Sequence, residues 1–333
     1  MSRQRILALL RAEEGAFLSG EQLSERLGLS RTAIWKAVRG LRQEGYEIEA
    51  RTGMGYRLVS APDVLTEAEI RSFFSESKET GRNLLCFDTI DSTNTFARRI
   101  AMEGAAGGTA VIADSQTAGR GRMGRSFQSP KGKGIYLSVL FRPHLPPERM
   151  MSVTALAGLA VCDAVERVCG VRPGLKWPND PVLGNRKLCG VLTEMALEGE
   201  TGQVQHLVVG VGINVHHTPA DFQDEVADIA TSLRMELGKP VSRPRLTAAL
   251  LEELDRMYRA LLTGDLTEQL AAYRRDCVNL GKTVQLIGAD GRETVTAVDV
   301  DETFGLVVRT AEGTEKTVRS GEVSVRGLYG YVE

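Results

Sequence analysis

The sequence is poor in the residues that disulfide frameworks and zinc sites require. Its 333 residues include five cysteines, an odd number with no Cys-x-x-Cys pair, and only four histidines. His216 and His217 are adjacent rather than four residues apart, and no third type of ligand clusters with them. These absences argue against a disulfide-stapled domain and against a fixed metal site, and a reducing cytoplasm fits the composition best.

We expect neither an export signal nor a membrane span in this sequence. The short apolar run at residues 6–10 is followed by Arg11, Glu13 and Glu14 with no small-residue cleavage site, so we expect no export signal. The most apolar stretch, around residues 151–165, is interrupted by Ser152 and other small polar residues, and it falls short of a membrane span. We expect a buried helix there and no membrane association.

The remaining composition is that of a globular protein, with 42% hydrophobic and 25% charged residues and a length sufficient for two or three domains. Residues 1–60 carry 10 Lys and Arg against 7 Asp and Glu, whereas the rest carries 31 against 36. A net charge of +3 on the first part and −5 on the second permits a nucleic-acid contact on the first part only.

The first sixty residues predict two short helices, a turn, a longer helix and a β-hairpin. Ser19 followed by Gln22 is a capping box, and Ser30 can cap the longer helix. The apolar stripe of that helix includes Ile34 and Val38, which leaves an exposed tryptophan among basic residues on the opposite face. The residues expected to contact DNA are Arg31, Thr32, Trp35, Lys36 and Arg39.

A hairpin follows, with strands at residues 46–50 and 56–59 around a Gly53-Met54-Gly55 turn. A helix-turn-helix followed by such a hairpin resembles a winged helix, whose second helix enters the major groove. A protein-binding helical domain is the alternative. We expect the domain to end at residue 60 and a linker to span residues 61–66, where Pro62 breaks the pattern.

Residues 67–276 alternate between strands and helices, beginning with a short helix that Thr66 and Glu69 can cap. Several strands are apolar throughout, so we expect a central mixed sheet covered by helices, in a multidomain α+β protein. The expected strands are 84–88, 110–113, 135–141, 188–194 and 207–215, and the expected helices are 92–103, 147–169 and 243–262.

Residues 277–333 have a different sequence pattern, in which short segments of alternating apolar and polar residues are separated by glycine turns. This pattern predicts a small β-barrel. Its expected strands are 283–287, 293–300, 305–310 and 317–325.

The segment from Gln116 to Phe127, with the sequence QTAGRGRMGRSF, places three arginines among three glycines between two strands. Glycine lets the backbone approach a phosphate closely, and the guanidinium fork binds charged oxygens. A solvated basic loop or an RNA-contacting stretch would have the same composition. The segment alone therefore indicates anion binding without identifying the anion.

Four further segments have the residue types of a ligand site. They are Asp91-Ser92-Thr93-Asn94, Lys176-Trp177-Pro178-Asn179-Asp180, Lys187-Leu188-Cys189-Gly190 and Gly210-Val211-Gly212-Ile213-Asn214-Val215. Each segment alone also has a structural explanation: a helix cap, a turn, a solvated lysine or close packing at glycines.

In this order and together, the five segments resemble the biotin protein ligases, and the preceding winged helix resembles the bifunctional members that also repress the biotin operon. The resemblance spans essentially the whole chain. It implies a central domain related to class II synthetase folds, lying between the DNA-binding domain and an SH3-like C-terminal barrel.

The resemblance also implies an ATP-dependent reaction. The carboxylate of biotin attacks the α-phosphorus of ATP to give biotinyl-5'-AMP, and a lysine of biotin carboxyl carrier protein then accepts the biotinyl group. This chemistry requires positioning and charge stabilisation but no enzyme nucleophile. The sequence accordingly contains neither a Gly-x-Ser-x-Gly motif nor a credible Cys/His pair.

Residue roles follow from matching the family's motifs. Arg120, Gly121 and Arg122 match the stretch that closes over biotin and the adenylate, and Lys187 matches the lysine near the carboxylate and the α-phosphate. We expect Lys187 and Arg122 to be the catalytic side chains. Neutral donors and acceptors for the ureido ring of biotin would come from Ser92, Thr93, Asn94 and Gln116.

Nucleotide contacts are expected from a second set of side chains. Mg²⁺ is expected to arrive with ATP, with at most one or two protein carboxylates as ligands. The set comprises Arg122, Arg125, Phe127, Asn179, Asp180, Lys187 and Asn214.

Two positions depart from the family pattern. Phe127 stands where the family loop commonly has Trp, which leaves less area for stacking on adenine. Cys189 replaces a smaller residue, so a thiol reagent would inhibit the protein if this side chain pointed into the pocket.

The implied regulation uses biotinyl-5'-AMP as corepressor: the holo protein dimerises and presents two recognition helices to operator DNA of the biotin genes. Two other functions stay open. One is a lipoate protein ligase, which shares the central fold, and the other is a ligand-sensing repressor without ligase turnover.

Overall fold

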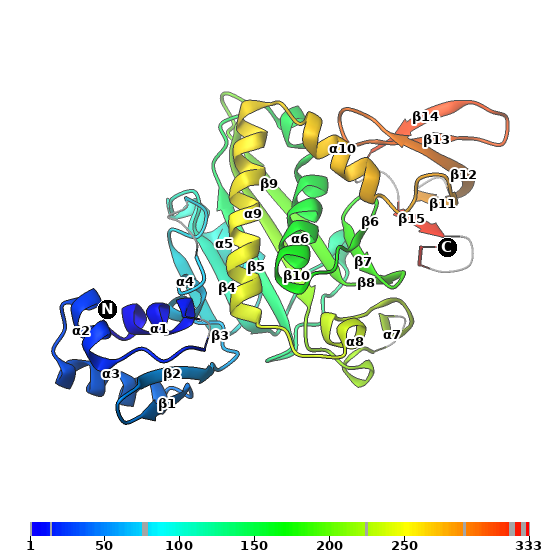
Figure 1. The fold of residues 1–333 in the computed structure, drawn as a ribbon. Coiled ribbons are helices and arrows are strands. Elements are labelled where there is room, and N and C mark those ends of the chain that lie inside the picture. The colour runs from blue at the N-terminus through cyan, green and yellow to red at the C-terminus, as the bar shows by residue number, and fades with distance from the viewer. Residues whose placement is uncertain are drawn as a thin grey trace. The chain divides into compact units, whose positions relative to one another are not determined.

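The computed structural model describes residues 2–13, 15–74, 79–223, 226–288, 291–319, 324–327 and 331–332. The chain divides into two compact units, Met1–Ser75 and Glu76–Glu333. Figure 1 shows the elements of each unit along the chain.

The first unit contains the predicted helix-turn-helix. The hydroxyl of Ser19 accepts from Gln22 N at 3.0 Å, and the Gln22 side chain returns to Ser19 N at 2.8 Å. Ser30 caps the next helix through Ala33 N. The predicted helix starts are therefore confirmed. The elements are α1 (Ser2–Ala12), α2 (Gly20–Leu27), α3 (Arg31–Gln43), β1 (Glu47–Arg51), β2 (Gly55–Ser60) and α4 (Glu67–Arg71).

The wing is the antiparallel hairpin of β1 and β2, as predicted. Leu18, between the helices, exchanges backbone hydrogen bonds with Tyr56 of the wing at 2.8 and 2.9 Å. Gly55 has φ of +105°, and a Cβ at this position would fall 1.9 Å from the Leu18 carbonyl oxygen. Only glycine therefore fits where the wing meets the helices.

Helix α4 lies in the first unit, whereas the predicted domain limits assign it to the catalytic domain. Thr66 caps the helix through Glu69 N as expected. The Glu69 carboxylate is buried and accepts hydrogen bonds from Arg11 at 2.6 Å and from the Tyr46 hydroxyl. This ion pair holds α4 on the first unit, and no periodicity in the sequence could have revealed it.

A five-stranded mixed sheet forms the centre of the second unit, in the order β3-β4-β5-β10-β9. Strands β3 and β4 are parallel and the other pairs antiparallel. The predicted strands are thereby confirmed within a few residues. Their bounds are β3 (Leu84–Ile90), β4 (Ala110–Gln116), β5 (Gly134–Phe141), β9 (Cys189–Leu197) and β10 (Val204–Asn214).

Helices cover both faces of this sheet. On one face, Ala97 of α5 (Thr93–Met102) packs against Val111, Leu140 and Val208. On the other face lie α6 (Val153–Cys169) and α9 (Arg243–Thr263), which run side by side in Figure 1. Residues 147–169, predicted as one helix, comprise a 3-10 turn, η2 (Pro147–Met150), and then α6.

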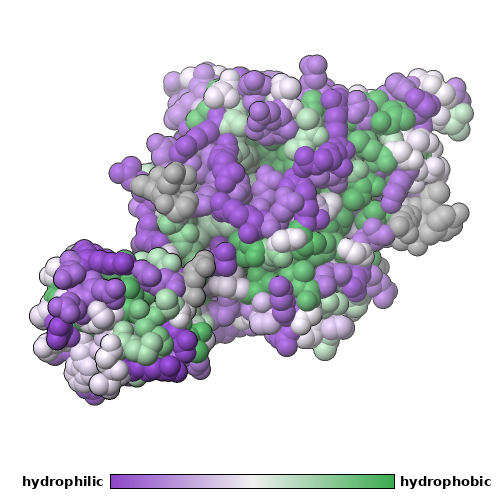
Figure 2. All heavy atoms as spheres, viewed as in Figure 1, coloured by the Kyte–Doolittle hydropathy of each residue, from purple (hydrophilic) through white to green (hydrophobic). Residues whose placement is uncertain are grey.

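Hydrophilic residues cover much of the face carrying α9 and α6, with hydrophobic areas between them, as Figure 2 shows. The described helices include none that is long and apolar enough to cross a bilayer. Strands β6 (Gly174–Lys176), β7 (Asp180–Leu183) and β8 (Arg186–Lys187) form a separate three-stranded sheet. The other short elements are η1 (Arg122–Gly124), η3 (Pro219–Asp221), α7 (Val226–Ile229), α8 (Leu233–Leu237) and α10 (Thr267–Asp276).

The C-terminal part of the second unit is a five-stranded antiparallel sheet of the SH3-like type, in the order β14-β13-β12-β11-β15. Alternate side chains such as Val284 and Leu286 are buried inside it. The predicted strand 317–325 is divided into two, and residues 320–323 lie outside the described part. The strands are β11 (Thr283–Gly288), β12 (Gly291–Val300), β13 (Leu306–Arg309), β14 (Glu315–Val318) and β15 (Ser324–Gly327).

Candidate active site

A cavity of about 370 Å³ opens on the α5 face of the central sheet. The biotin and nucleotide residues proposed from the sequence all line this cavity, although they come from five separate segments. They are Ser92, Thr93, Asn94, Gln116, Arg120, Gly121, Arg122, Arg125, Phe127, Asn179, Asp180, Lys187 and Asn214.

One end of the cavity holds a buried polar cluster. Gln116 Oε1 accepts from the backbone N and the hydroxyl of Thr93, at 2.8 and 3.1 Å. Ser138 Oγ lies 2.8 Å from Thr93 Oγ1 and 2.6 Å from Asn94 Oδ1. These neutral groups fix one another's orientation before any ligand binds, which suits recognition of a polar ring in an apolar pocket.

Ser138 was not predicted from the sequence because it sits inside the apolar run of β5. The only available signal was one serine in an otherwise apolar strand. Position 210 also requires glycine. A Cβ on Gly210 would fall 2.0 Å from Asn94 Oδ1. The first glycine of the Gly-x-Gly strand therefore makes room for this amide.

Residues 119–127, which we name the flap, form a small closed hairpin. Gly121 N donates to Arg125 O at 2.7 Å, and Phe127 N donates to Gly119 O at 2.9 Å. Arg122 extends from the flap across the cavity and donates to Asn179 Oδ1 at 2.7 Å. Burial lowers the pKa of Arg122 from its usual value, yet an arginine stays charged at neutral pH.

Phe127 ends the flap and lies over the bare backbone of the central sheet. A Cβ on Gly212 would fall 2.5 Å from the Phe127 ring, and one on the neighbouring Gly190 would fall 3.4 Å from it. Tyr136 meets the same ring edge to face, with the centroids 6.4 Å apart. The second glycine of the Gly-x-Gly strand thus leaves space for an aromatic side chain.

Lys187 and Asp180 form an ion pair at the other end of the cavity, with 2.7 Å between Nζ and Oδ1. Asp180 also accepts a hydrogen bond from the Tyr331 hydroxyl. Burial alone would raise the pKa of Asp180, but the charges of Lys187 and Lys176 and the two hydrogen bonds hold it below its usual value. The carboxylate is therefore ionised at neutral pH and fixes the position of the lysine.

Lys176 also lines the cavity, although the sequence motifs gave it no role. Its side chain is buried, and Nζ lies 3.8 Å from the centre of the Tyr331 ring. Burial lowers the pKa of Lys176 to about 8, aided by Lys187 and nearby arginines and opposed by Asp180. A second ammonium group therefore lies beside the Lys187 pair.

The two asparagines proposed as nucleotide contacts also hold the backbone. Asn179 Nδ2 donates to Val191 O at 2.9 Å, and Asn214 Nδ2 donates to Thr231 O at 3.0 Å. Both side chains are buried, and the amide of each is oriented by a backbone carbonyl of another segment.

The carboxylates near the cavity are already paired. Glu194, beside the lining residues, accepts from Asn94 and pairs with Arg98 and Arg120. Asp180 is the only acidic side chain among the described lining residues, and its oxygens are already bonded to Lys187 and Tyr331. No three His, Cys, Asp or Glu side chains of the described chain gather in a way that could hold a metal ion. The donor set fits a metal that arrives on phosphate oxygens rather than one held by the protein.

Cys189 points away from the cavity. Its neighbour Gly190 faces Phe127 and Lys187, and successive strand residues face opposite sides of a sheet. Cys189 pairs in register with Ile213, is fully buried, and has its pKa raised by that burial. The condition under which a thiol reagent would block the pocket is therefore not met.

The proposed DNA residues lie together on one face of α3. All five are exposed, and 52% of the surface of Trp35 is accessible. The Arg39 guanidinium lies 5.6 Å from the centre of the Trp35 ring, and Arg31 is 3.7 Å from Glu21. This face carries positive charge and leaves a large aromatic side chain in solvent.

Comparison with known proteins agrees with this architecture. The HTH domain model matches residues 2–57, the Biotin/lipoate A/B protein ligase family model matches residues 86–214, and the Biotin protein ligase C terminal domain model matches residues 280–326. Bifunctional ligase/repressor BirA of Bacillus subtilis (strain 168) is 36% identical over 94% of this chain and 96% of its own length. The chain belongs to the bifunctional biotin ligase/repressor family.

Further relatives support the same family. The protein of the same name from Escherichia coli (strain K12) is 31% identical, over 97% of this chain and 96% of its own. The solved structure of the biotin protein ligase from Aquifex aeolicus in complex with biotin and ATP has a TM-score of 0.64 and 32% identity, covering 74% of this chain and 99% of that chain. The family and the fold class predicted from the sequence are both confirmed.

Proposed function

We propose that this protein makes biotinyl-5'-AMP from biotin and ATP, transfers biotin to a lysine of biotin carboxyl carrier protein, and represses the biotin genes in response to the adenylate. The observation that carries the proposal is one cavity lined by a neutral polar cluster, an arginine flap and a fixed ammonium group. Together these groups suit a polar bicyclic ring, a phosphate and a developing negative charge.

The roles divide along the cavity. The Thr93, Asn94 and Gln116 cluster, with Ser92 at the start of α5, would bind the ureido ring of biotin. Arg120, Gly121 and Arg122 would close over the adenylate and keep water from its labile mixed anhydride. The bonds within the flap support this role because they give the flap a defined shape.

Lys187 and Arg122 would stabilise the charge that develops as the biotin carboxylate attacks the α-phosphorus. The Asp180 carboxylate would keep the Lys187 ammonium in place during the attack. Phe127, Arg125, Asn179 and Asn214 would contact the nucleotide, with Phe127 offering a ring for adenine. The acceptor lysine of the carrier supplies the second nucleophile, so the chain need not form a covalent intermediate.

Mg²⁺ would neutralise the leaving pyrophosphate when it is bound. The chain's own contribution would be Lys176 and Arg125, whose positive charges lie at the end of the cavity where Asp180 is already paired. ATP would thus carry its metal into a site that has no free carboxylate among its described residues.

The regulatory part of the proposal rests on the first unit. The exposed residues Arg31, Thr32, Trp35, Lys36 and Arg39 of α3 would enter the major groove of operator DNA. Biotinyl-5'-AMP would favour a homodimer that offers two such helices to two half-sites. A cytoplasmic location fits the five cysteines, which form no disulfide in the described part of the chain.

A labelling assay tests the ligase reaction and its substrate. The protein is incubated with ATP, Mg²⁺ and either labelled biotin or labelled lipoate, and the carrier protein is then added. Label on the carrier from biotin alone is expected. Transfer of lipoate would indicate a lipoate ligase, and adenylate binding without transfer would indicate a sensing repressor.

Substitution of Lys187 tests the catalytic assignment. Lys187→Ala should lower the rate of adenylate formation by at least about 100-fold, as expected when a charge-stabilising group is removed. The matched control is Lys239→Ala, which removes an exposed lysine outside the cavity and should leave the rate unchanged. Wild-type turnover in folded Lys187→Ala protein would refute the role of Lys187.

A further inference from the structure

The segment of residues 176–180, which carries Lys176 and Asp180, is held in place by the C-terminal part of the chain. Trp177 is fully buried, and its backbone N donates to Asn279 Oδ1 at 2.7 Å. The Trp177 indole Nε1 donates to Phe304 O at 2.9 Å. The Tyr273 hydroxyl donates to Pro178 O at 3.2 Å. Buried hydrogen bonds of this kind fix the segment relative to α10 and the C-terminal sheet.

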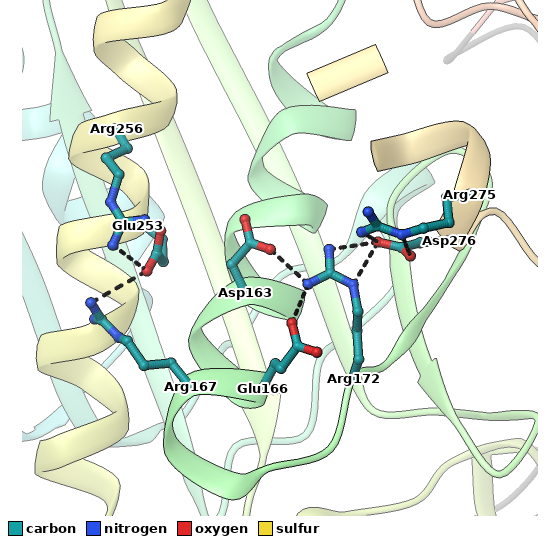
Figure 3. A network of polar contacts seen from close by, with 8 residues as sticks. All are labelled: Asp163, Glu166, Arg167, Arg172, Glu253, Arg256, Arg275 and Asp276. Carbon is teal, nitrogen blue, oxygen red and sulfur yellow. Dashed lines mark hydrogen bonds and ion pairs between the residues drawn. The ribbon is translucent and has the colours of Figure 1, made fainter. Parts of the chain in front are cut away.

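The end of α10 is in turn fixed to α6. Arg172 donates to Asp276, the last residue of α10, and also pairs with Asp163 and Glu166 of α6 (Figure 3). Two residues further on, Val278 N donates to Leu175 O at 2.9 Å. The chain thus enters the C-terminal sheet alongside the strand that leads into residues 176–180.

The chain returns to the same segment near its C-terminus. Tyr331 donates its hydroxyl to Asp180 Oδ2 and places its ring beneath the Lys176 ammonium. Val332 beside it is 1% exposed, so the tail is packed at this point. Burial raises the pKa of Tyr331 well above its usual value, which keeps the hydroxyl protonated as a donor.

Asp180 is therefore bonded on both oxygens. Oδ1 accepts from Lys187 Nζ at 2.7 Å, and Oδ2 accepts from Tyr331. A carboxylate held by one donor can rotate and change the place of its partner, whereas a second donor on the other oxygen fixes the carboxylate plane. Lys187 forms its ion pair with this carboxylate, so the hydroxyl of Tyr331 is bonded to the counter-ion of the lysine.

We propose that Tyr331 is a positioning residue of the ligase, and that the C-terminal tail orients Lys187 through Asp180. This inference rests on the catalytic role proposed for Lys187. It gives the C-terminal sheet a defined part in the first half-reaction, because that sheet and its tail hold the lysine's counter-ion in place.

The test is Tyr331→Phe, which keeps the ring beneath Lys176 and removes only the hydroxyl. The rate constant for adenylate formation, per active site titrated with biotin, should fall about tenfold, because a hydrogen bond to a buried charge is removed. The KM for biotin should stay within about twofold, since the polar cluster around Thr93 is untouched. An unchanged rate constant would overturn the proposal.

Tyr258→Phe is the matched control. It removes a hydroxyl from a half-buried tyrosine of α9 whose ring stacks on Phe141 outside the cavity. Its rate constant should match that of the wild type. An equal loss in both variants would mean that the effect of Tyr331→Phe is general destabilisation, and it would overturn the proposal.

A double variant separates this inference from the role of Lys187. In a Lys187→Ala background, Tyr331→Phe should cause no further loss, because the hydroxyl acts only through the lysine. A similar tenfold loss in both backgrounds would overturn the positioning role while leaving Lys187 as the catalytic group. Wild-type turnover in Lys187→Ala alone would instead refute the proposed function.

Discussion

Two glycines of the central sheet are required because neighbouring side chains occupy the space that a Cβ would fill. Gly210 and Gly212 alternate along β10, and both face the cavity. The first makes room for Asn94 and the second for Phe127. The Gly-x-Gly pattern therefore leaves space for two different side chains that line the cavity.

Gly210→Ala tests this constraint at the biotin end. The new methyl group would lie 2.0 Å from Asn94 Oδ1, so the amide must move and its contact with Ser138 must break. We expect the Kd for biotin, measured by calorimetry, to rise at least about tenfold, in line with about 1–3 kcal/mol for overpacking.

Gly199→Ala is the control for that measurement, because a Cβ at this position meets no atom within 4 Å. It should bind biotin as the wild type does. Equal affinity in the Gly210→Ala variant would show that Asn94 does not contribute to the biotin site.

At the scale of elements, the helix caps and the apolar strands were predictable because their causes are local. Ser19 and Ser30 bond to backbone groups three residues away, and β5 is buried on both faces. The short strands β6, β7 and β8 were missed because two to four residues are too few for any periodicity.

In the candidate site, too, local sequence patterns predicted some residues and missed others. The residues proposed from the motifs line the cavity. Ser138 and Tyr331 lie outside every motif, and Lys176 lies in a motif but was given no role. Tyr331 reaches Asp180 across 151 positions of sequence. Such a contact depends on how α10 and the C-terminal sheet pack. The spacing of residues in the sequence does not predict that packing.

Helix α3 supports a prediction of its own. A variant with both Lys36→Ala and Arg39→Ala should bind operator DNA more weakly, and the slope of log K against log salt should decrease by about 1 for each DNA phosphate that the variant no longer neutralises. Binding measured by fluorescence anisotropy at several salt concentrations checks this. Ligation of biotin to the carrier should be unchanged.

Arg5→Ala serves as the control, because Arg5 is an exposed arginine of α1 in the same unit. It removes a positive charge without altering α3 and should retain the wild-type salt slope. An unaltered slope in the α3 variant would show that this face does not bind phosphate.

At the scale of the whole molecule, the two compact units divide the proposed activities. The first unit carries the exposed basic face, and the second carries the cavity with every proposed biotin and nucleotide residue. One chain offers one α3 helix, so recognition of an operator with two half-sites requires two chains.

Sedimentation velocity tests this requirement. Adding biotin, ATP and Mg²⁺ should convert a largely monomeric protein into a dimer of twice the 36.2 kDa chain mass. ATP and Mg²⁺ without biotin should leave it monomeric, because the adenylate is the proposed corepressor. The same sedimentation coefficient with and without biotin would contradict ligand-driven dimerisation.

Gly190 and Gly212 leave only backbone facing the Phe127 ring, and this determines which substitutions the site can accept. A flat surface without side chains accepts any planar ring, so position 127 can change between Phe and Trp by repacking alone. Position 212 has no such freedom, because a methyl group there would fall 2.5 Å from an atom of the Phe127 ring. Natural or engineered variation in nucleotide preference should therefore be found in the aromatic side chain above the strand, while the glycine below it stays invariant.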